Sequence, residues 1–176
     1  MRKWGVLVAA VVILAVINVS ILQKERHLAD GRVVYLELAP VDPRSLMQGD
    51  YMTLNFAIQD QIRQAQRSRQ AAAEKDRSYD GQVVVHLNDR QVAEFVRLAQ
   101  GGLSLEKDEM LLAYRVRNQR VKFATNAFFF EEGSGDRYEP AQYGLFRVND
   151  KGEPLLVSLH DADLKPLGFQ DRAQIM

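Results

Sequence analysis

The sequence contains no cysteine, only three histidines and one tryptophan, and as many acidic as basic residues. Without cysteine the chain cannot form a disulfide, a zinc–thiolate site, an iron–sulfur cluster or a thiol nucleophile. The balance of 23 basic against 23 acidic residues excludes a general nucleic-acid-binding protein, because such a protein needs a basic surface. The hydrophobic fraction of 47% excludes a disordered chain, and 176 residues suffice for one domain with its own core.

Motifs that bind cofactors or carry out catalysis are also missing. The sequence has no Walker loop, dinucleotide-binding fingerprint, G-x-S-x-G segment or kinase motif. The histidines His27, His86 and His160 lack the close spacing of metal ligands, and the pair Asp161 and Asp163 beside His160 is typical of a polar turn. We therefore predict a protein that is not an enzyme, with no catalytic residue, no metal, no cofactor and no small-molecule ligand.

A long apolar segment lies near the N-terminus. Residues 4–22, WGVLVAAVVILAVINVSIL, contain no charged side chain. At ~1.5 Å per residue, a helix of this length spans the ~30 Å hydrocarbon core of a lipid bilayer. A cleaved signal peptide is the alternative, but its apolar region is shorter and is followed by a pair of small residues. The segment therefore predicts an uncleaved transmembrane signal-anchor helix.

The charges around this segment predict its orientation. Arg2 and Lys3 precede it, and the positive-inside rule places residues 1–3 in the cytoplasm. A polar juxtamembrane linker follows at residues 23–32, and the rest of the chain then lies outside. We expect a single-pass protein of the bacterial inner membrane whose domain, residues 33–170, is periplasmic or otherwise extracytoplasmic.

Short β-like runs dominate this exported domain. Residues 33–38 are rich in β-branched and aromatic side chains, and residues 51–56 alternate between two faces. Three pairs of such runs flank short polar turns and predict β-hairpins: 82–87 with 91–98, 110–117 with 120–130, and 143–149 with 154–160. Roughly eight strands with short turns indicate a mainly β fold, an antiparallel sandwich or an open barrel.

One segment departs from the β pattern. Residues 57–77 contain no glycine or proline and are rich in Gln, Ala and Arg, which favour a helix. A thin apolar stripe runs along it at helical spacing, formed by Ile58, Ile62, Ala65 and Ala72. The helix could act as a docking element or a lid, but we interpret it as a solvated helical insertion across one sheet edge.

The segment before the second run carries a recognisable motif. Turn-forming residues, Asp42, Pro43, Gly49 and Asp50, precede Tyr51, Leu54 and Phe56. Gly49-Asp50-Tyr51 with Leu54 resembles the signature of the bacterial GDYXXLXY proteins, and Phe56 stands where the last Tyr of that signature falls. Residues 128–133 and 155–159 resemble later segments of the same family. The resemblance implies a membrane-anchored protein that acts with a multi-pass membrane partner.

This motif has two interpretations: a structural turn, or a remnant of a peptidase site. In the structural one, Gly49 adopts a positive φ, Asp50 binds nearby backbone amides, and the following apolar side chains pack as the strand leaves the turn. A fainter likeness to signal peptidases rests on Pro43 and Gly49-Asp50. Their nucleophilic serine is missing here, because Pro40 occupies its position.

An aromatic and acidic segment is the best candidate for a partner surface. Phe128, Phe129 and Phe130 are consecutive and are followed by Glu131 and Glu132. Side chains of a strand alternate between its faces, so three consecutive Phe residues cannot all face one core. Either both faces are covered here, or at least one Phe is exposed for a partner.

These observations favour a membrane-anchored, non-enzymatic accessory or binding domain on the outer face of the inner membrane, with a multi-pass membrane protein as partner. An envelope enzyme or a ligand-sensing domain with a pocket beside the Asp42–Asp50 turn is the alternative.

Overall fold

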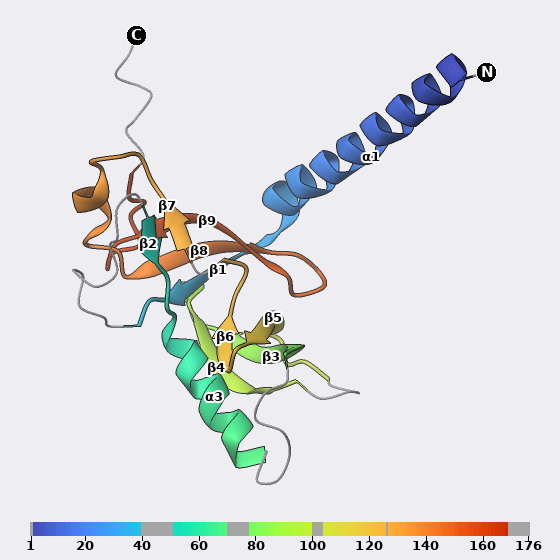
Figure 1. Cartoon of the computed structure of the whole chain (residues 1–176). Helices are drawn as coiled ribbons and strands as arrows, with labels where there is room; N and C mark the ends of the chain where they lie inside the picture. Colours follow the sequence, from blue (N-terminus) through green and yellow to red (C-terminus); the bar gives the residue numbers. More distant parts are fainter. Residues whose placement is uncertain (1, 40–50, 70–77, 100–103, 126, 169–176) are drawn as a thin grey trace.

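The computed structural model of the chain describes residues 2–39, 51–69, 78–99, 104–125 and 127–168, without the side chains of residues 2–3 and 5–8. Helix α1 (Arg2–Asp30) projects from a mainly β body, as Figure 1 shows. The polar side chains of Asn18 and Ser20 bond back to the Leu14 and Val16 carbonyls of the same helix. The predicted linker is helical up to Asp30. Within the described part of the chain, no helix combines the length and the apolar character needed to cross a membrane.

The strands form three antiparallel sheets. Strands β1 (Arg32–Glu37), β8 (Tyr143–Val148) and β9 (Pro154–His160) form the first in the order β1-β8-β9. The second is the ribbon of β2 (Tyr51–Thr53) and β7 (Ala127–Phe129). The third has the order β4-β3-β5-β6, from Ala93–Leu98, Tyr79–Leu87, Glu109–Arg117 and Arg120–Lys122. The predicted mainly β fold is confirmed, with a half-barrel sheet and a helix.

The three predicted hairpins are present, but one of them is shorter than expected. Strands β3 and β4, β5 and β6, and β8 and β9 pair as antiparallel neighbours. The prediction of one strand over residues 120–130 is wrong, because β6 ends at Lys122 and β7 pairs with β2 instead. Ala124 has a φ of 36°, and the Thr125 hydroxyl bonds to the Ala127 backbone. This local turn interrupts the strand.

Helix α3 (Ala57–Arg69) begins where the sequence predicted a helix, and residues 70–77 of that prediction lie outside the described residues. At its start, the Gln59 side chain accepts a hydrogen bond from the Phe56 backbone amide, which satisfies one free N–H of the first turn. Ile58 and Ile62 are 5% and 0% exposed. The interpretation as a solvated insertion is therefore corrected: the apolar stripe is part of the hydrophobic core, and burial of such side chains drives packing.

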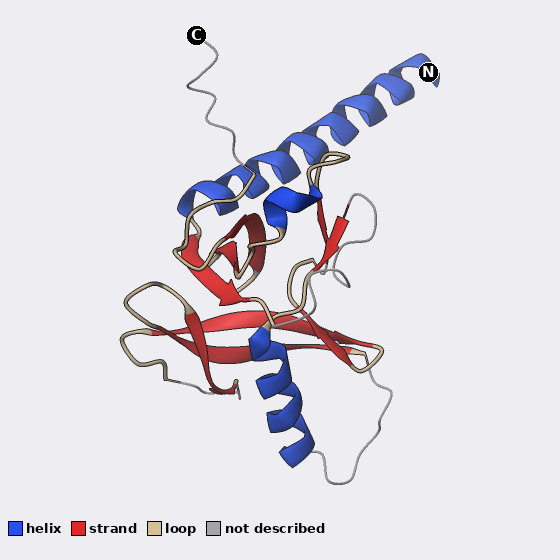
Figure 2. Ribbon diagram, turned by 90° about the vertical axis from the view of Figure 1, so that its left-hand side faces the viewer, coloured by secondary structure: helices blue, strands red, loops and turns tan. Residues whose placement is uncertain are grey.

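Helices α1 and α3 lie on opposite sides of the four-stranded sheet, as the two views agree in showing (Figures 1 and 2). The β2–β7 ribbon lies on the same side as α1. The base of α1 is attached to strand β8. His27 Nε2 lies 2.9 Å from the Arg147 carbonyl oxygen, and Arg147 Nη1 donates to the Gly31 carbonyl at 2.9 Å. The direction of α1 relative to the β body is thus held by specific contacts.

A bidentate ion pair links strands β4 and β5. The two terminal nitrogens of Arg97 lie 2.5 and 2.9 Å from the two carboxylate oxygens of Glu109. These hydrogen bonds, with one from the Glu106 backbone amide, lower the pKa of Glu109 below its ordinary value of 4.5. A carboxyl with a lowered folded-state pKa stabilises the fold above its unfolded pKa, and this contribution is lost as the pH falls through the folded pKa.

We therefore expect the Glu109→Gln substitution to destabilise the chain above pH 4.5 and to have a shrinking effect below it. Urea unfolding of the full chain in detergent, followed by circular dichroism over this pH range, measures the difference from the wild type. Glu132→Gln, which removes an exposed carboxylate on a turn, is the control. If the stability difference between Glu109→Gln and the wild type stays constant with pH, the pKa of Glu109 is not lowered in the folded state.

Candidate functional site

The described half of the predicted motif lies at the junction of β2 and α3. Leu54 and Phe56 are each 1% exposed and belong to the hydrophobic core. The Phe56 ring meets the Phe146 ring at 5.4 Å and the Phe123 ring at 6.2 Å, both edge to face. The turn residues Asp42, Pro43, Gly49 and Asp50 lie outside the described residues.

The aromatic segment after residue 126 divides between the core and the surface. Phe128 and Phe130 pack on the ring of Tyr138, at 5.1 and 5.2 Å, in the 3-10 helix η1 (Gly135–Tyr138). Phe129 is 74% exposed, and its ring lies 5.8 Å from that of Tyr51 on the paired strand. Of the two alternatives for three consecutive Phe residues, the exposed one is present.

The acidic residues continue this surface. Glu131 and Glu132 are both exposed in the turn after β7, and the Ser134 amide and hydroxyl both donate to the Glu131 carbonyl. We call Tyr51, Phe129, Glu131 and Glu132 the ribbon surface. It combines one exposed aromatic ring with two carboxylates.

A serine–histidine pair that the sequence analysis did not single out lies on β9. Ser158 Oγ is 2.9 Å from His160 Nε2, and His160 Nδ1 is 2.8 Å from the Leu164 carbonyl oxygen. With Nδ1–H donating to that carbonyl, Nε2 accepts the Ser158 hydroxyl, as in a serine activated by a base. Both side chains are 5% exposed, however, and the Tyr35 ring packs on His160 at 5.2 Å. The hydrogen bonds of this pair are therefore made inside the fold, between β9 and the turn that follows it. The Ser-x-His spacing on one strand face was its only sequence signal.

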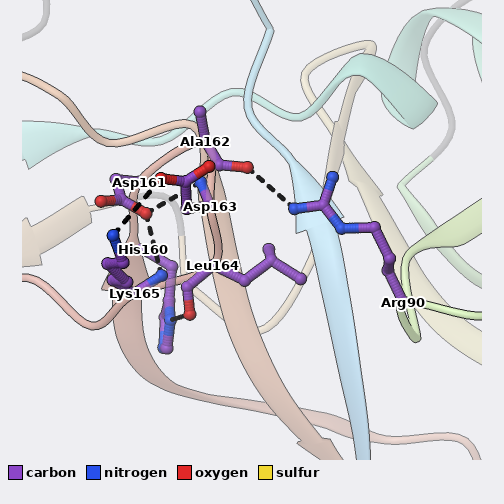
Figure 3. A network of polar contacts seen from close by, with 7 residues as sticks. All are labelled: Arg90, His160, Asp161, Ala162, Asp163, Leu164 and Lys165. Carbon is purple, nitrogen blue, oxygen red and sulfur yellow. Dashed lines mark hydrogen bonds and ion pairs between the residues drawn. The ribbon is translucent and has the colours of Figure 1, made fainter.

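Several hydrogen bonds hold the turn after β9, as Figure 3 shows. Asp161 Oδ1 accepts hydrogen bonds from the backbone amides of Asp163 and Lys165. Arg90, from the β3–β4 hairpin, donates to the Ala162 carbonyl at 2.8 Å. The Asp161 carboxylate is therefore engaged by backbone amides, which supports the interpretation as a polar turn. Across the described residues, no three His, Asp or Glu side chains converge as a metal site would require.

A cleft of about 970 Å³ lies at the base of α1. It lies between the end of α1, the β3–β5–β6 region and the tip of the β8–β9 hairpin. Leu111, Ala113 and Arg115 of β5 line it, and so does Tyr114, which is 5% exposed. The hairpin tip closes one end, because the Gly152 carbonyl accepts a hydrogen bond from the Ala113 amide at 2.7 Å. A cavity of this volume can hold a small molecule or a headgroup.

Six of the fifteen residues that line this cleft are charged. The cations are Lys24, Arg115, Lys122 and Lys151, and the carboxylates are Asp80 and Glu153. On β3, burial and the neighbouring Tyr114 raise the pKa of Tyr79 above its ordinary value. The lining residues come from separate parts of the chain, and no spacing in the sequence brings them together. The sequence analysis therefore missed them.

The cleft differs in position from the predicted pocket. We expected a pocket beside the Asp42–Asp50 turn, which lies outside the described residues. Neither Tyr51 nor Leu54 nor Phe56 lines the cleft at the base of α1.

Comparison with known proteins identifies the family but adds no activity. The model of the family described as "GDYXXLXY protein" matches residues 13–159, which includes the motif and extends into β9. No curated protein and no solved structure shows significant similarity to this chain. Since the family match spans most of the sequence, the chain belongs to the GDYXXLXY family.

Proposed function

We propose that this protein is a membrane-anchored, non-enzymatic accessory domain that docks on a multi-pass membrane protein through its ribbon surface. The carrying observation is the 74% exposure of Phe129 on the side of the body from which α1 departs. Exposed aromatic side chains of this size are typical of interaction sites, where they supply much of the binding energy.

The apolar side chains of α1 support anchoring in the lipid bilayer through residues 4–22. Large hydrophobic side chains are exposed all around this part of the helix: Val11, Val12, Ile13, Leu14, Val16, Ile17, Val19, Ile21 and Leu22. A helix that is apolar on all sides needs an apolar environment, and the bilayer provides it. Arg2 and Lys3 favour a cytoplasmic N-terminus. The body is then extracytoplasmic, in the periplasm of the bacterial cell.

The position of the ribbon surface supports a partner that lies in the membrane. Because β2 and β7 lie on the α1 side of the four-stranded sheet, Phe129 is on the half of the body that is nearer the bilayer. Helix α3, on the opposite side, is farther away. Anchoring confines both proteins to one plane and raises their effective concentration, so a small contact surface suffices.

The test is a Phe129→Ala substitution in the full-length chain, purified in mild detergent with its bound proteins. We expect a multi-pass membrane protein in stoichiometric amount with the wild type and at least about tenfold less with the variant, because a loss of ~1.4 kcal/mol in binding is tenfold.

Val96→Ala is the matched control, because Val96 is 40% exposed on β4, away from the ribbon. Both substitutions should leave the urea midpoint nearly unchanged, since exposed positions contribute within about 0.5 kcal/mol. A solitary wild-type monomer, or a partner retained by Phe129→Ala, would contradict the proposal.

A ligand-sensing domain is the second candidate function. The cleft at the base of α1, with its four cations, is the observation that favours it.

A further inference from the structure

The cleft at the base of α1 is placed at the level of lipid headgroups if α1 is the membrane anchor, and the inference below rests on that proposed function. Lys24 follows Leu22, the last residue of the apolar segment, by two positions, and His27 follows it by five. At ~1.5 Å per residue these lie about 3 and 8 Å beyond the hydrocarbon. The headgroup layer of each leaflet is about 5–8 Å thick. The α1 wall of the cleft therefore crosses this layer.

The cations of the cleft outnumber its free carboxylates. Asp80 forms an ion pair with Arg117, with 2.7 Å between Oδ1 and Nη2. Glu153 accepts a hydrogen bond from the Asn149 side-chain amide at 2.8 Å. Among the described residues, no carboxylate lies within ion-pair distance of Lys24, Lys122 or Lys151. The chain as a whole has no net charge, so this is a local concentration of positive charge. A low-dielectric wall focuses such a field on the cleft.

Two of these cations stand directly opposite each other. Arg115 on β5 is the register partner of Lys122 on β6, and Asp80 on β3 lies on the other side of Arg115. Like charges at directly opposite positions destabilise a sheet. The Arg115 guanidinium is fixed by its hydrogen bond to the Ala124 carbonyl, at 2.8 Å, which holds it beside Lys122. An anion placed between Arg115 and Lys122 would reduce this repulsion, and Asp80 offers a carboxylate only on the opposite side of Arg115.

We propose that this cleft binds the phosphate group of an anionic lipid headgroup in the outer leaflet of the membrane. A guanidinium held in place together with several ammonium groups is a typical combination for phosphate, because the guanidinium donates in a fixed fork and the ammonium groups add point charges. His27 also lines the cleft, but its ring nitrogen Nε2 is hydrogen-bonded to the Arg147 carbonyl oxygen and is not available to the phosphate. A bound headgroup would bridge α1, β6 and the β8–β9 tip and so fix the body on the bilayer surface.

The experiment compares the full chain in nanodiscs of phosphatidylcholine alone and in nanodiscs that also contain phosphatidylglycerol. Hydrogen exchange of the amides at residues 120–124 and 150–153 is the readout, because a ligand that binds the closed form lowers the population of the locally open form. We expect exchange about threefold slower with phosphatidylglycerol, which corresponds to a lipid concentration about twice the dissociation constant. A Lys122→Gln/Lys151→Gln double variant should lose this effect.

The control variant is Lys107→Gln/Lys165→Gln, which removes the same charge from exposed positions outside the cleft. It should respond to phosphatidylglycerol as the wild type does. In phosphatidylcholine discs, whose only lipid is zwitterionic and has no net negative charge, the cleft variant should melt no lower than the wild type, because it loses a like-charge pair. A wild-type response to phosphatidylglycerol in the control variant, together with a lost response in the cleft variant, supports the proposal.

Other outcomes overturn it in distinguishable ways. If inorganic phosphate added to phosphatidylcholine discs slows exchange as much as phosphatidylglycerol does, the ligand is free phosphate and the lipid assignment is wrong. If the chain stays with both kinds of disc but exchange is the same in both, the cleft is not a headgroup site and the anchor is unaffected. If the chain does not elute with the discs at all, the anchoring proposal itself fails, and this inference fails with it.

Discussion

Replacing Phe56 with alanine is expected to lower the free energy of unfolding by about 3–5 kcal/mol, the usual cost of removing a buried aromatic ring. Phe56 is 1% exposed and makes edge-to-face contacts with both Phe146 and Phe123. Its loss would remove the apolar contacts between the β1–β8–β9 sheet and the β5–β6 region and leave a cavity. Urea unfolding of the full chain in detergent, followed by circular dichroism, measures the effect.

This substitution also tests what the family motif does at its described end. If Phe56 acts as a structural residue, Phe56→Ala loses stability, whereas Phe129→Ala, at a 74% exposed position, stays within about 0.5 kcal/mol of the wild type. A Phe56→Ala protein that unfolds at the wild-type urea concentration would show that this side chain has no structural role.

Replacing Gly152 with alanine is expected to cost about 2–3 kcal/mol, for two separate reasons. Gly152 has a φ of 80°, a conformation that alanine adopts only with strain. A Cβ atom would also lie 2.7 Å from the Leu111 carbonyl oxygen, so the backbone must shift. That shift would weaken the hydrogen bond from the Ala113 amide to the Gly152 carbonyl, which holds the hairpin tip on β5.

Gly133→Ala separates these two contributions. Gly133 has a similar φ of 77°, but no atom lies within 4 Å of the position of its Cβ. It should therefore show only the conformational cost, about 1 kcal/mol. Thermal and urea unfolding of both variants in the same detergent give the comparison. Equal losses would mean that the contact with Leu111 contributes nothing.

The hairpins show why local patterns were sufficient for part of the fold. In the β3–β4 turn, Asn88 Oδ1 accepts hydrogen bonds from the amides of Arg90 and Val92, and in the β5–β6 turn Asn118 and Gln119 both have a positive φ. Asparagine tolerates these conformations and binds its own backbone. Such turns need only neighbouring residues, so they could be located from composition and alternation alone.

The segment after β6 shows where the same reasoning failed. Residues 120–130 read as one continuous strand, because β-branched and aromatic side chains persist through most of the segment. The bend at Ala124 and Thr125 redirects the chain, and β7 pairs with β2, a strand far away in the sequence. A strand finds its partner by burial and register, and these depend on segments that are distant along the chain.

Helix α3 is an intermediate case. Its position and its apolar stripe were predicted from spacing, but whether that stripe faced solvent or the core depended on the sheet beneath it. Ile62 is 0% exposed, and Gln66 Nε2 donates to the Tyr114 hydroxyl at 3.1 Å. The apolar side of this weakly apolar helix is therefore buried in the core by packing on the sheet, which its own sequence could not show.

The sequence by itself determined the mainly β character, the hairpin turns, the start of α3 and the family, because each of these depends on short-range pattern or on a contiguous motif. Only the tertiary structure decided which Phe is exposed on the β2–β7 ribbon, and only it paired Ser158 with His160 and Arg115 with Lys122. It also assembled the cleft at the base of α1 from residues between Lys24 and Pro154. The physical reason is that a site made by strand register and by packing of distant segments has no contiguous signal in the chain.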